Sequence, residues 1–370
     1  MTAISASYEP VRFAELPGWE RDSHLGAFNA FLRSSGPVRA HAVATAAIAQ
    51  SLASRLAAAC EAAEILTNAG EVTEAGARAF FEAHFTPHRM CHNGAEGLLT
   101  AYYEPVIEGS LERTSRFNIP VYRRPPDLIN LVSDAARGTV GEALTHARQT
   151  STRLEPFATR EAIEQGALEG KGLELLWLED AVDCFFLHIQ GSGLIRLKDG
   201  PALRITYDGK NGHPYTSVGR YLIDQGHFTF AQMSLDAMKL WLGKDAERGR
   251  RAMWQNKSFV FFRVLEGEEA KSAMGVMHIP LTEGRSLAVD TSFHTIGTPV
   301  YVCAPHLTHA AGSEDGFARL MIAQDAGSAI RGPERGDLYF GSGDRAGALA
   351  GITKHPGSYF VLLPIPQAVS

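Results

Sequence analysis

Residues 317–332, with the sequence FARLMIAQDAGSAIRG, are the most informative stretch of the chain. The mostly apolar run 317–323 predicts a strand, and the carboxylate of Asp325 follows at its end. The small residues 326–328 would let a bulky ligand approach the backbone, because glycine permits close contacts that other residues do not. A carboxylate in an apolar, glycine-lined setting can have a raised pKa and so act as a general acid near neutral pH. The alternative is an ordinary turn, in which Asp near Gly is common.

Length and composition describe a globular chain of about two domains. The chain has 370 residues, of which 45% are hydrophobic and 21% charged, so it can bury large cores. The net charge of -6 and the pI of about 6.2 argue against a nucleic-acid binder, which usually presents a basic face. The 4 cysteines form no CxxC pair and the 14 histidines form no HExxH motif, so we expect no metal site.

The N-terminus carries no export signal that the sequence reveals. Residues 1–5 have neither the basic region nor the apolar region of a signal peptide. No uninterrupted apolar run of the chain is long enough to span a bilayer.

The first 95 residues are predicted to be helical. Residues 19–32 form a short amphipathic segment, which we expect to end at the sequence Ser34–Ser35–Gly36–Pro37. A long alanine-rich helix with an apolar face over 48–66 follows. Thr73 can cap a third helix, which is rich in phenylalanine. We interpret this region as packing without chemistry.

From Gly97 onward the pattern changes to short apolar segments separated by turn residues, which favours strands. Three helices interrupt this pattern, at 159–165, 217–224 and 235–242. Many short strands at turn-punctuated intervals suggest a barrel or a sandwich. The predicted strands are 98–107, 185–190, 194–197, 203–207, 259–262, 287–290, 299–302, 317–323 and 359–363.

Three aspartates in the last third of the chain sit at predicted strand ends: Asp290, Asp325 and Asp337. If their strands share one barrel, the carboxylates could converge, and clustered carboxylates push one another's pKa apart, which suits acid/base chemistry. Each aspartate could equally be a turn residue that hydrogen-bonds the backbone. Next to Asp325, Gly327 and Ala329 are candidates for close contact with a substrate.

Two loops in the middle of the chain have the composition of carbohydrate sites. The first, Gln190–Gly191–Ser192–Gly193, offers amides and a hydroxyl group to a sugar. No GxSxG motif supports Ser192 as a nucleophile, and no GxGxxG motif indicates a dinucleotide site there. The second, 208–215, combines polar donors with an aromatic face. The alternative to a sugar site is a glycine-rich turn for the first loop and a solvated loop for the second. The candidates in the second loop are Lys210, Asn211, His213 and Tyr215.

Several short blocks identify a family when they are taken together and in order. They are Leu99–Val106, Gln190–Gly193, Tyr207–Tyr215, Asn256–Phe262, Pro280–Leu281, Val289–Asp290, Gly297–Pro299, the stretch around Asp325, and Asp337–Tyr339. This set resembles the membrane-bound lytic transglycosylase A family of bacterial peptidoglycan-cleaving enzymes. The resemblance runs from about Gly97 to the C-terminus, and the helical N-terminal part does not contribute to it.

The resemblance implies a mainly β protein with helices and two domains. One domain is discontinuous, 1–103 plus 252–370, and joins N-terminal helices to a double-psi β-barrel that carries the three aspartates. The other, 104–251, is a smaller inserted β-rich domain that binds glycan. A groove between the two is expected to hold the glycan strand.

The resemblance also implies the chemistry, which is non-hydrolytic cleavage of the β-1,4 bond between N-acetylmuramic acid and N-acetylglucosamine to give 1,6-anhydro ends. Asp325 matches the catalytic aspartate, which acts as acid and then as base, and Asp290 and Asp337 match two aspartates that line or support the site. No cofactor or metal is required. A glycoside hydrolase and a non-catalytic wall-binding protein on the same barrel are alternatives. An aspartic protease would need a second Asp–Ser/Thr–Gly loop, which is missing.

The remaining matches concern the substrate and the location. Tyr102 and Tyr103 match an aromatic pair near the domain crossover, and Gln190, Gly191 and Ser192 match the groove-facing loop. The implied partners are peptidoglycan glycan strands and no nucleic acid; we expect a monomer that could join a cell-wall synthesis complex. Family members are usually anchored to the outer membrane, which implies a periplasmic or outer-membrane location, although this chain shows neither a signal peptide nor a lipobox cysteine.

Overall fold

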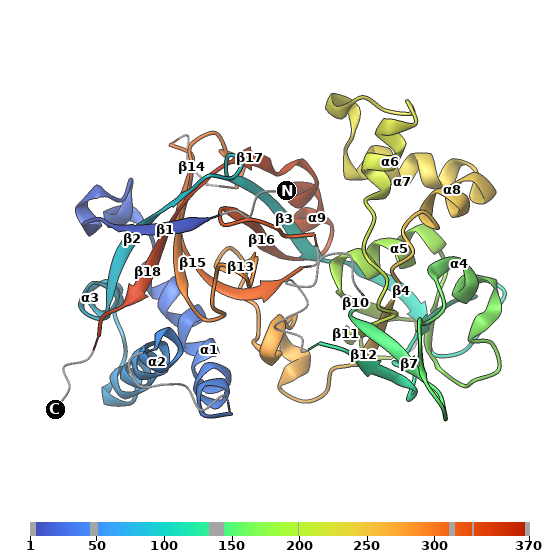
Figure 1. The fold of residues 1–370 in the computed structure, drawn as a ribbon, viewed down its shortest axis with the longest axis horizontal. Coiled ribbons are helices and arrows are strands. Elements are labelled where there is room, and N and C mark those ends of the chain that lie inside the picture. Colours follow the sequence, from blue (N-terminus) through green and yellow to red (C-terminus); the bar gives the residue numbers. More distant parts are fainter. Residues whose placement is uncertain are drawn as a thin grey trace. The chain divides into compact units, whose positions relative to one another are not determined.

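A computed structural model of the protein describes residues 5–44, 51–132, 144–198, 200–310, 315–327 and 329–366. Figure 1 shows the ribbon, coloured along the chain. The chain forms two compact units: Met1–Tyr102, Met274–Gly341 and Thr353–Ser370 make the first, and Tyr103–Ala273 and Ser342–Ile352 make the second. Within the described ranges, no helix combines the length and the apolar character needed to cross a membrane.

The first unit is built on a nine-stranded sheet. β13 lies inside this sheet, parallel to β15 on one side and antiparallel to β16 on the other. The double-psi connectivity of the strands stays a prediction. In sheet order the strands are β1 (Ala6–Pro10), β2 (Phe85–His92), β18 (Ser358–Pro364), β14 (Pro299–Ala304), β15 (Phe317–Ala326), β13 (Ser286–Val289), β16 (Arg335–Ser342), β3 (Leu98–Glu104) and β17 (Lys354–Pro356).

Three helices, α1 (His24–Ala44), α2 (Leu52–Ala69) and α3 (Glu74–His84), pack with this sheet. α1 contacts β15 and α2 contacts β18. Thr73 caps α3 as predicted, since its hydroxyl accepts a hydrogen bond from the Gly76 amide. The helices and strands share one apolar cluster whose phenylalanine rings meet mostly edge to face, which aromatic pairs prefer.

The prediction that the first helix ends at Ser34–Pro37 is wrong. α1 continues through Pro37 to Ala44. Ser34 and Ser35 are 0% and 1% exposed, because this part of α1 packs against α2 and β15. Tertiary packing here outweighs the helix-breaking tendency of the Gly–Pro pair. The next predicted helix starts later than expected, at Leu52, and the predicted face residue Ile48 lies outside the described residues.

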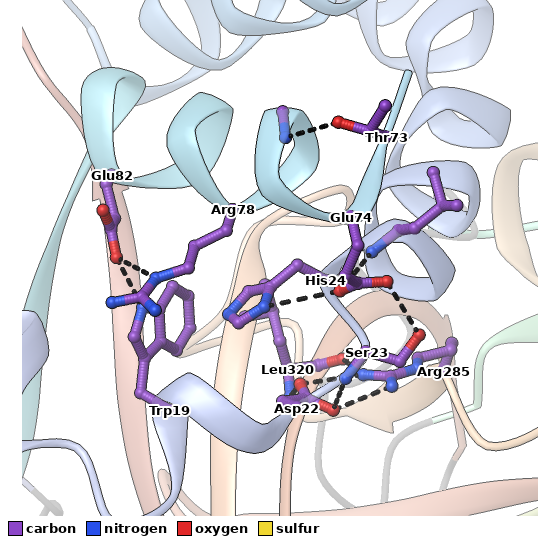
Figure 2. Close-up of polar contacts among 12 residues, drawn as sticks. Trp19, Asp22, Ser23, His24, Thr73, Glu74, Arg78, Glu82, Arg285 and Leu320 are labelled. Carbon is purple, nitrogen blue, oxygen red and sulfur yellow. Dashed lines mark hydrogen bonds and ion pairs between the residues drawn. The ribbon is translucent and has the colours of Figure 1, made fainter. Parts of the chain in front are cut away.

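A polar network fastens the N-terminal segment to the sheet (Figure 2). Asp22 accepts two hydrogen bonds from the Arg285 guanidinium, at 2.8 and 2.9 Å, and one from the Leu320 amide at 2.7 Å. Nearby, Glu82 accepts from the Trp19 indole at 2.9 Å. Because Leu320 belongs to β15, the N-terminal helices are part of the same folded unit as the strand that carries Asp325.

The second unit holds a six-stranded sheet and a three-stranded sheet. In the six-stranded sheet, β4 and β10 pair in parallel. The larger sheet has the order β12 (Val260–Val264), β11 (Leu203–Lys210), β10 (Ser192–Leu197), β4 (Val106–Ser110), β9 (Glu174–Leu178) and β5 (Ile119–Tyr122). The smaller has β6 (Leu128–Asn130), β7 (His146–Gln149) and β8 (Leu154–Glu155). Its helices are α4 (Arg160–Ala162), α5 (Ala181–Gln190), α6 (Val218–Asp224), α7 (Leu235–Lys244), α8 (Ala246–Met253) and α9 (Asp344–Ile352).

The predicted strand 185–190 is wrong, because these residues form the end of α5. Asp180 caps this helix by accepting hydrogen bonds from the amides of Val182 and Asp183. Gly191 ends it with a left-handed backbone, φ 78°. Residues 184–188 of this helix are buried without interruption, and a short unbroken apolar run reads the same in a buried helix as in a buried strand.

Other predicted elements of the second unit are confirmed. Ser217 caps α6 and α7 begins at Leu235. Thr159 caps α4, but the chain then widens into a π turn, Ile163–Ala167, in which Gly166 has a φ of 105°.

The boundaries of the two units differ from the predicted domains. The inserted domain is predicted to end at 251, whereas the second unit continues to Ala273. The reason is that β12 pairs with β11, from Val264 opposite Ile205 to Val260 opposite Lys210. The short segment Ser342–Ile352, which contains α9, also belongs to the second unit.

Candidate active site

Strand register places Asp325 and Asp337 in one row across the sheet of the first unit. Ala288 of β13 pairs with Asp325 of β15 on one side and with Asp337 of β16 on the other. Neighbouring strands lie about 4.8 Å apart, so the two Cα atoms are roughly 10 Å apart. Ala288, which lies between them, is buried and has a small side chain.

Asp325 lies in a setting that suits proton transfer. Its side chain is partly exposed, yet burial among protein atoms raises its pKa to about 6, and the charge of Asp337 adds to this shift. A hydrogen bond from the Ala326 amide, at 2.9 Å, and the nearby Val276 amide act in the opposite direction. A carboxyl with a pKa near 6 is populated in both forms close to neutral pH, so it can donate and accept a proton.

Two tyrosines adjoin this row. The rings of Tyr102 on β3 and Tyr339 on β16 lie 5.2 Å apart between centroids. The Tyr102 hydroxyl lies beside the Asp325 carboxyl and lowers its pKa, although the pair does not reach the geometry of a regular hydrogen bond. Burial, and next the charge of Asp325, raise the pKa of Tyr102 well above 10, so its hydroxyl keeps its proton.

Asp337 has polar partners that Asp325 lacks. Its Oδ1 atom accepts hydrogen bonds from the Thr100 hydroxyl and from the Arg335 guanidinium, with which it forms an ion pair. The same guanidinium donates to Thr100 at 2.9 Å and to the Gly336 carbonyl at 2.8 Å. The two carboxylates of the row therefore differ: one is set among apolar groups and backbone amides, and the other is held by a cation.

The structure does not bring Asp290 into this row. Its side chain is 3% exposed. Oδ1 accepts from the amide and the hydroxyl of Ser292, at 3.0 and 2.7 Å, and Oδ2 accepts from the Gly332 amide at 2.8 Å. Its carbonyl oxygen accepts from the amides of Phe293 and His294. Asp290 thus fastens the turn after β13 to the loop after β15.

The residues after Asp325 form the start of that loop. Gly327 is packed against Ile330, because an added Cβ would lie 3.1 Å from the Ile330 Cδ1 atom. Ala329 is exposed. Ser328 lies outside the described residues.

In the second unit, the predicted loop 190–193 lies at the junction of α5 and β10. The Oε1 atom of Gln190 accepts from the Tyr103 amide at 3.2 Å. Gly191 ends α5, and Ser192 is the largely buried first residue of β10. Tyr103 is also buried and packs against Gly347, where an added Cβ would lie 2.9 Å from the tyrosine ring. These four predicted residues are therefore neighbours.

The second predicted loop, 208–215, has a partly structural role. Asn211 is 0% exposed. Its Nδ2 donates to the carbonyl oxygens of Ala158 and Lys257, both at 2.8 Å, and its Oδ1 accepts from the Phe259 amide at 2.9 Å. Both amide hydrogens are used, so Asn211 holds neighbouring loops together and is removed from the candidate ligand contacts.

The other three residues of this loop remain candidate ligand contacts, and their side chains differ in exposure. A ring nitrogen of His213 lies 2.8 Å from the Phe157 carbonyl oxygen. Lys210 is largely buried, whereas Tyr215 is partly exposed.

Three residues of the row were missed by the sequence argument: Thr100, Arg335 and Tyr339. Each lies two positions from a predicted residue on the same strand, and side chains two positions apart share a face. That alternation was a usable signal. The Val276 amide had no signal, because a backbone group carries no residue type.

Two family models match the chain. The model described as the MltA specific insert domain matches residues 98–263, and the model described as the 3D domain matches residues 285–363. The first match ends within the second unit, and the second includes Asp290, Asp325 and Asp337.

Known proteins resemble the chain over most of its length. The membrane-bound lytic murein transglycosylase A of Vibrio cholerae is 35% identical over 269 residues, which is 72% of this chain and 65% of that protein. The chain thus spans slightly less than two thirds of this relative. The crystal structure of a membrane-bound lytic murein transglycosylase from Agrobacterium tumefaciens has a TM-score of 0.83 at 35% identity, covering 97% of this chain and 98% of that one.

A third similar protein has been crystallised with a bound ligand. The crystal structure of E. coli MltA with bound chitohexaose has a TM-score of 0.66 at 29% identity, and covers 98% of this chain and 92% of that one. With the two matched models and the near-complete structural overlap, the chain belongs to the membrane-bound lytic murein transglycosylase A family.

Proposed function

We propose that this protein is a peptidoglycan lytic transglycosylase, which cleaves the β-1,4 bond between N-acetylmuramic acid and N-acetylglucosamine without water. The observation that carries the proposal is the carboxyl of Asp325, partly exposed and with a pKa raised to about 6, in register with Asp337. Membership of the family and the chitohexaose complex of the E. coli relative support the same substrate class.

In the proposed mechanism a single carboxyl acts twice. Protonated Asp325 donates its proton to the glycosidic oxygen, the bond from C1 to that oxygen breaks, and an oxocarbenium-like centre develops at C1. The Asp325 carboxylate then takes the proton of the C6 hydroxyl of the same muramic acid. The C6 oxygen bonds to C1, which closes the 1,6-anhydro ring and regenerates the acid. Because the nucleophile is part of the substrate, it is already held close to C1.

Asp337 fits a supporting role in this scheme. An ordinary glycosidase needs a second carboxyl to activate water or to form a covalent bond. One oxygen of Asp337 is already occupied by Thr100 and Arg335. We therefore assign to Asp337 a negative charge that stabilises the cationic centre, and to Asp290 the support of the loop that follows Asp325.

The proposal also includes the barrel, the substrate contacts, the oligomeric state and the location that the family resemblance implies. The nine-stranded sheet is proposed to form a double-psi barrel. We propose that Tyr102, with Gly327 and Ala329, contacts the sugar near Asp325, and that residues of the second unit contact the rest of the glycan. The candidates in the second unit are Tyr103, Gln190, Gly191, Ser192, Lys210, His213 and Tyr215. The proposed enzyme works as a monomer at the periplasmic face of the outer membrane.

The test is mass spectrometry of the products released from purified peptidoglycan sacculi. We expect muropeptides with anhydro ends, which are lighter by one water than those with reducing ends. Reducing ends would instead make the protein a glycoside hydrolase and Asp337 a candidate second carboxyl. Binding to sacculi without release of product would leave a wall-binding protein.

A further inference from the structure

β15 contains a bulge immediately before Asp325. Leu287 of β13 pairs with Ala323, but the next residue, Ala288, pairs with Asp325, so Gln324 has no partner on β13. An extra residue of this kind bends a strand and changes the direction of the side chain that follows it. The direction in which the Asp325 side chain projects from β15 therefore depends on how Gln324 is held.

The side chain of Gln324 is completely buried and fully engaged. Its Nε2 donates to the carbonyl oxygen of Ala30, at 2.7 Å, and to the hydroxyl of Ser34, at 2.8 Å, both in α1. Its Oε1 accepts from the Ser286 hydroxyl in β13 at 2.5 Å. An apolar residue here would leave the buried Ser34 and Ser286 hydroxyls without these hydrogen bonds, so the glutamine ties the bulge to both α1 and β13.

The backbone of Gln324 also meets the loop that contacts Asp325. A Cβ on Gly275 would lie 2.3 Å from the Gln324 carbonyl oxygen, so only glycine lets the loop pass this close. The Gly275 amide donates to the Ile279 carbonyl at 2.9 Å, which closes a tight loop. Within this loop Met277 and His278 both have a φ of 57°, which is a strained backbone conformation for residues other than glycine. This loop contacts β15 and brings the Val276 amide close to the Asp325 carboxyl, whose pKa it lowers.

We infer that Gln324 is a positioning residue for Asp325. α1 and Ser286 hold its side chain, the bulge directs Asp325 out of the strand, and the Gly275 loop meets the carboxyl there. The inference rests on the proposed function, in which Asp325 is the acid and base. It gives α1 a part in setting the site, although α1 lies outside both regions that the family models match.

The first arm of the test is kinetic. Gln324→Met keeps the length of the side chain and removes its hydrogen bonds. We expect its kcat for release of anhydro products to fall about 10- to 100-fold with KM nearly unchanged, since small misplacements of a reacting group cost this much. Ser34→Ala, which removes one partner, should lower kcat by less.

The matched control is Ser35→Ala. Ser35 is as buried as its neighbour Ser34, but its hydroxyl faces Cys60 and makes no hydrogen bond to Gln324. Its turnover should equal that of the wild type. Thermal unfolding of all three variants separates a loss of folded protein from a loss of turnover per folded molecule.

The second arm does not use activity. Hydrogen exchange followed on peptides that contain Val276 should accelerate in Gln324→Met and in Ser34→Ala, and remain unchanged in Ser35→Ala. If Gln324→Met does not fold, Ser34→Ala carries both arms. Wild-type kcat and unchanged exchange in the folded variants would overturn the inference. A wild-type protein that releases no anhydro product, with the expected exchange pattern, would overturn the proposed function and leave the positioning of Asp325 intact.

Discussion

Asp325 and Asp290 stand at the ends of two neighbouring parallel strands, yet their surroundings differ. Asp290 is buried and both of its oxygens accept hydrogen bonds from Ser292 and Gly332. Asp325 is partly exposed, is contacted by two amides and a tyrosine, and has a pKa raised to about 6. The same residue type at the same kind of position is fixed by regular hydrogen bonds to both oxygens in Asp290, whereas Asp325 receives one such bond, from the Ala326 amide, and is the carboxyl to which the proposed function assigns the proton transfer.

The largest effect is expected from Asp325→Asn, which tests the reactive side of this comparison. An amide of nearly the same shape cannot donate or accept the proton, so turnover should fall by about 100- to 10,000-fold. The protein should fold normally. Product release from sacculi gives the rate, and circular dichroism gives the control. Retained turnover would transfer the acid role to another carboxyl.

Asp290→Ala tests the structural side. The variant removes a buried carboxylate that accepts hydrogen bonds, and it leaves the amide of Gly332 without its partner. The free energy of unfolding should therefore fall by about 3 kcal/mol. Urea unfolding measures this change. Turnover per folded molecule should fall far less than in Asp325→Asn. A stable variant that has lost its turnover would show that Asp290 acts in the chemistry.

The pH dependence of stability sharpens the contrast. Because burial raises the pKa of Asp325 from 3.8 to about 6, the folded protein holds a proton that the unfolded chain has already lost. Stability should therefore fall as pH rises from about 4 to about 6 and then stay lower, by about 2 to 3 kcal/mol. Asp325→Asn should lack this decline. Thermal unfolding of both proteins at several pH values measures the difference, and parallel curves would contradict the raised pKa.

The smallest effect is expected from Asp337→Asn. An unpaired unit charge acting over about 10 Å contributes about 1.7 kcal/mol at an effective dielectric constant of about 20, and the ion pair with Arg335 reduces this contribution, so we expect roughly a tenfold change in rate. Turnover should therefore drop about tenfold with the anhydro product unchanged. A loss as large as that of Asp325→Asn would make Asp337 a second catalytic carboxyl, and the hydrolase reading would gain support.

Local signals in the sequence predict much of the fold. The caps Thr73 and Ser217 stand directly before the helices that they were expected to start. Burial explains both errors, since Phe185 lies in an unbroken buried run of a helix and Pro37 lies in a helix held by tertiary packing. Where burial surrounds an element, composition alone does not separate helix from strand.

Some residues of the candidate site could be predicted from the sequence, and others could not. Asp325 and Asp337 could be found from their place near strand ends, and Arg335 could have been found from alternation along β16. The bulge at Gln324 could not, because it exists only through the pairing of 287–288 with 323–325. No residue near Gln324 in the sequence reports that pairing.

The pairing of β2 with β18 has a consequence for the order of assembly. Arg89 and Phe360 face each other in adjacent strands, so β2, which also pairs with the earlier β1, gains this second partner only when the last strand has been made. At about 5 to 20 residues per second, the ribosome needs about 15 to 50 s to bridge that interval. Such distant pairing is slow to form. The carboxylate row itself needs β13, β15 and β16, which span Ser286 to Ser342, so it too can pair only after most of the chain has been made.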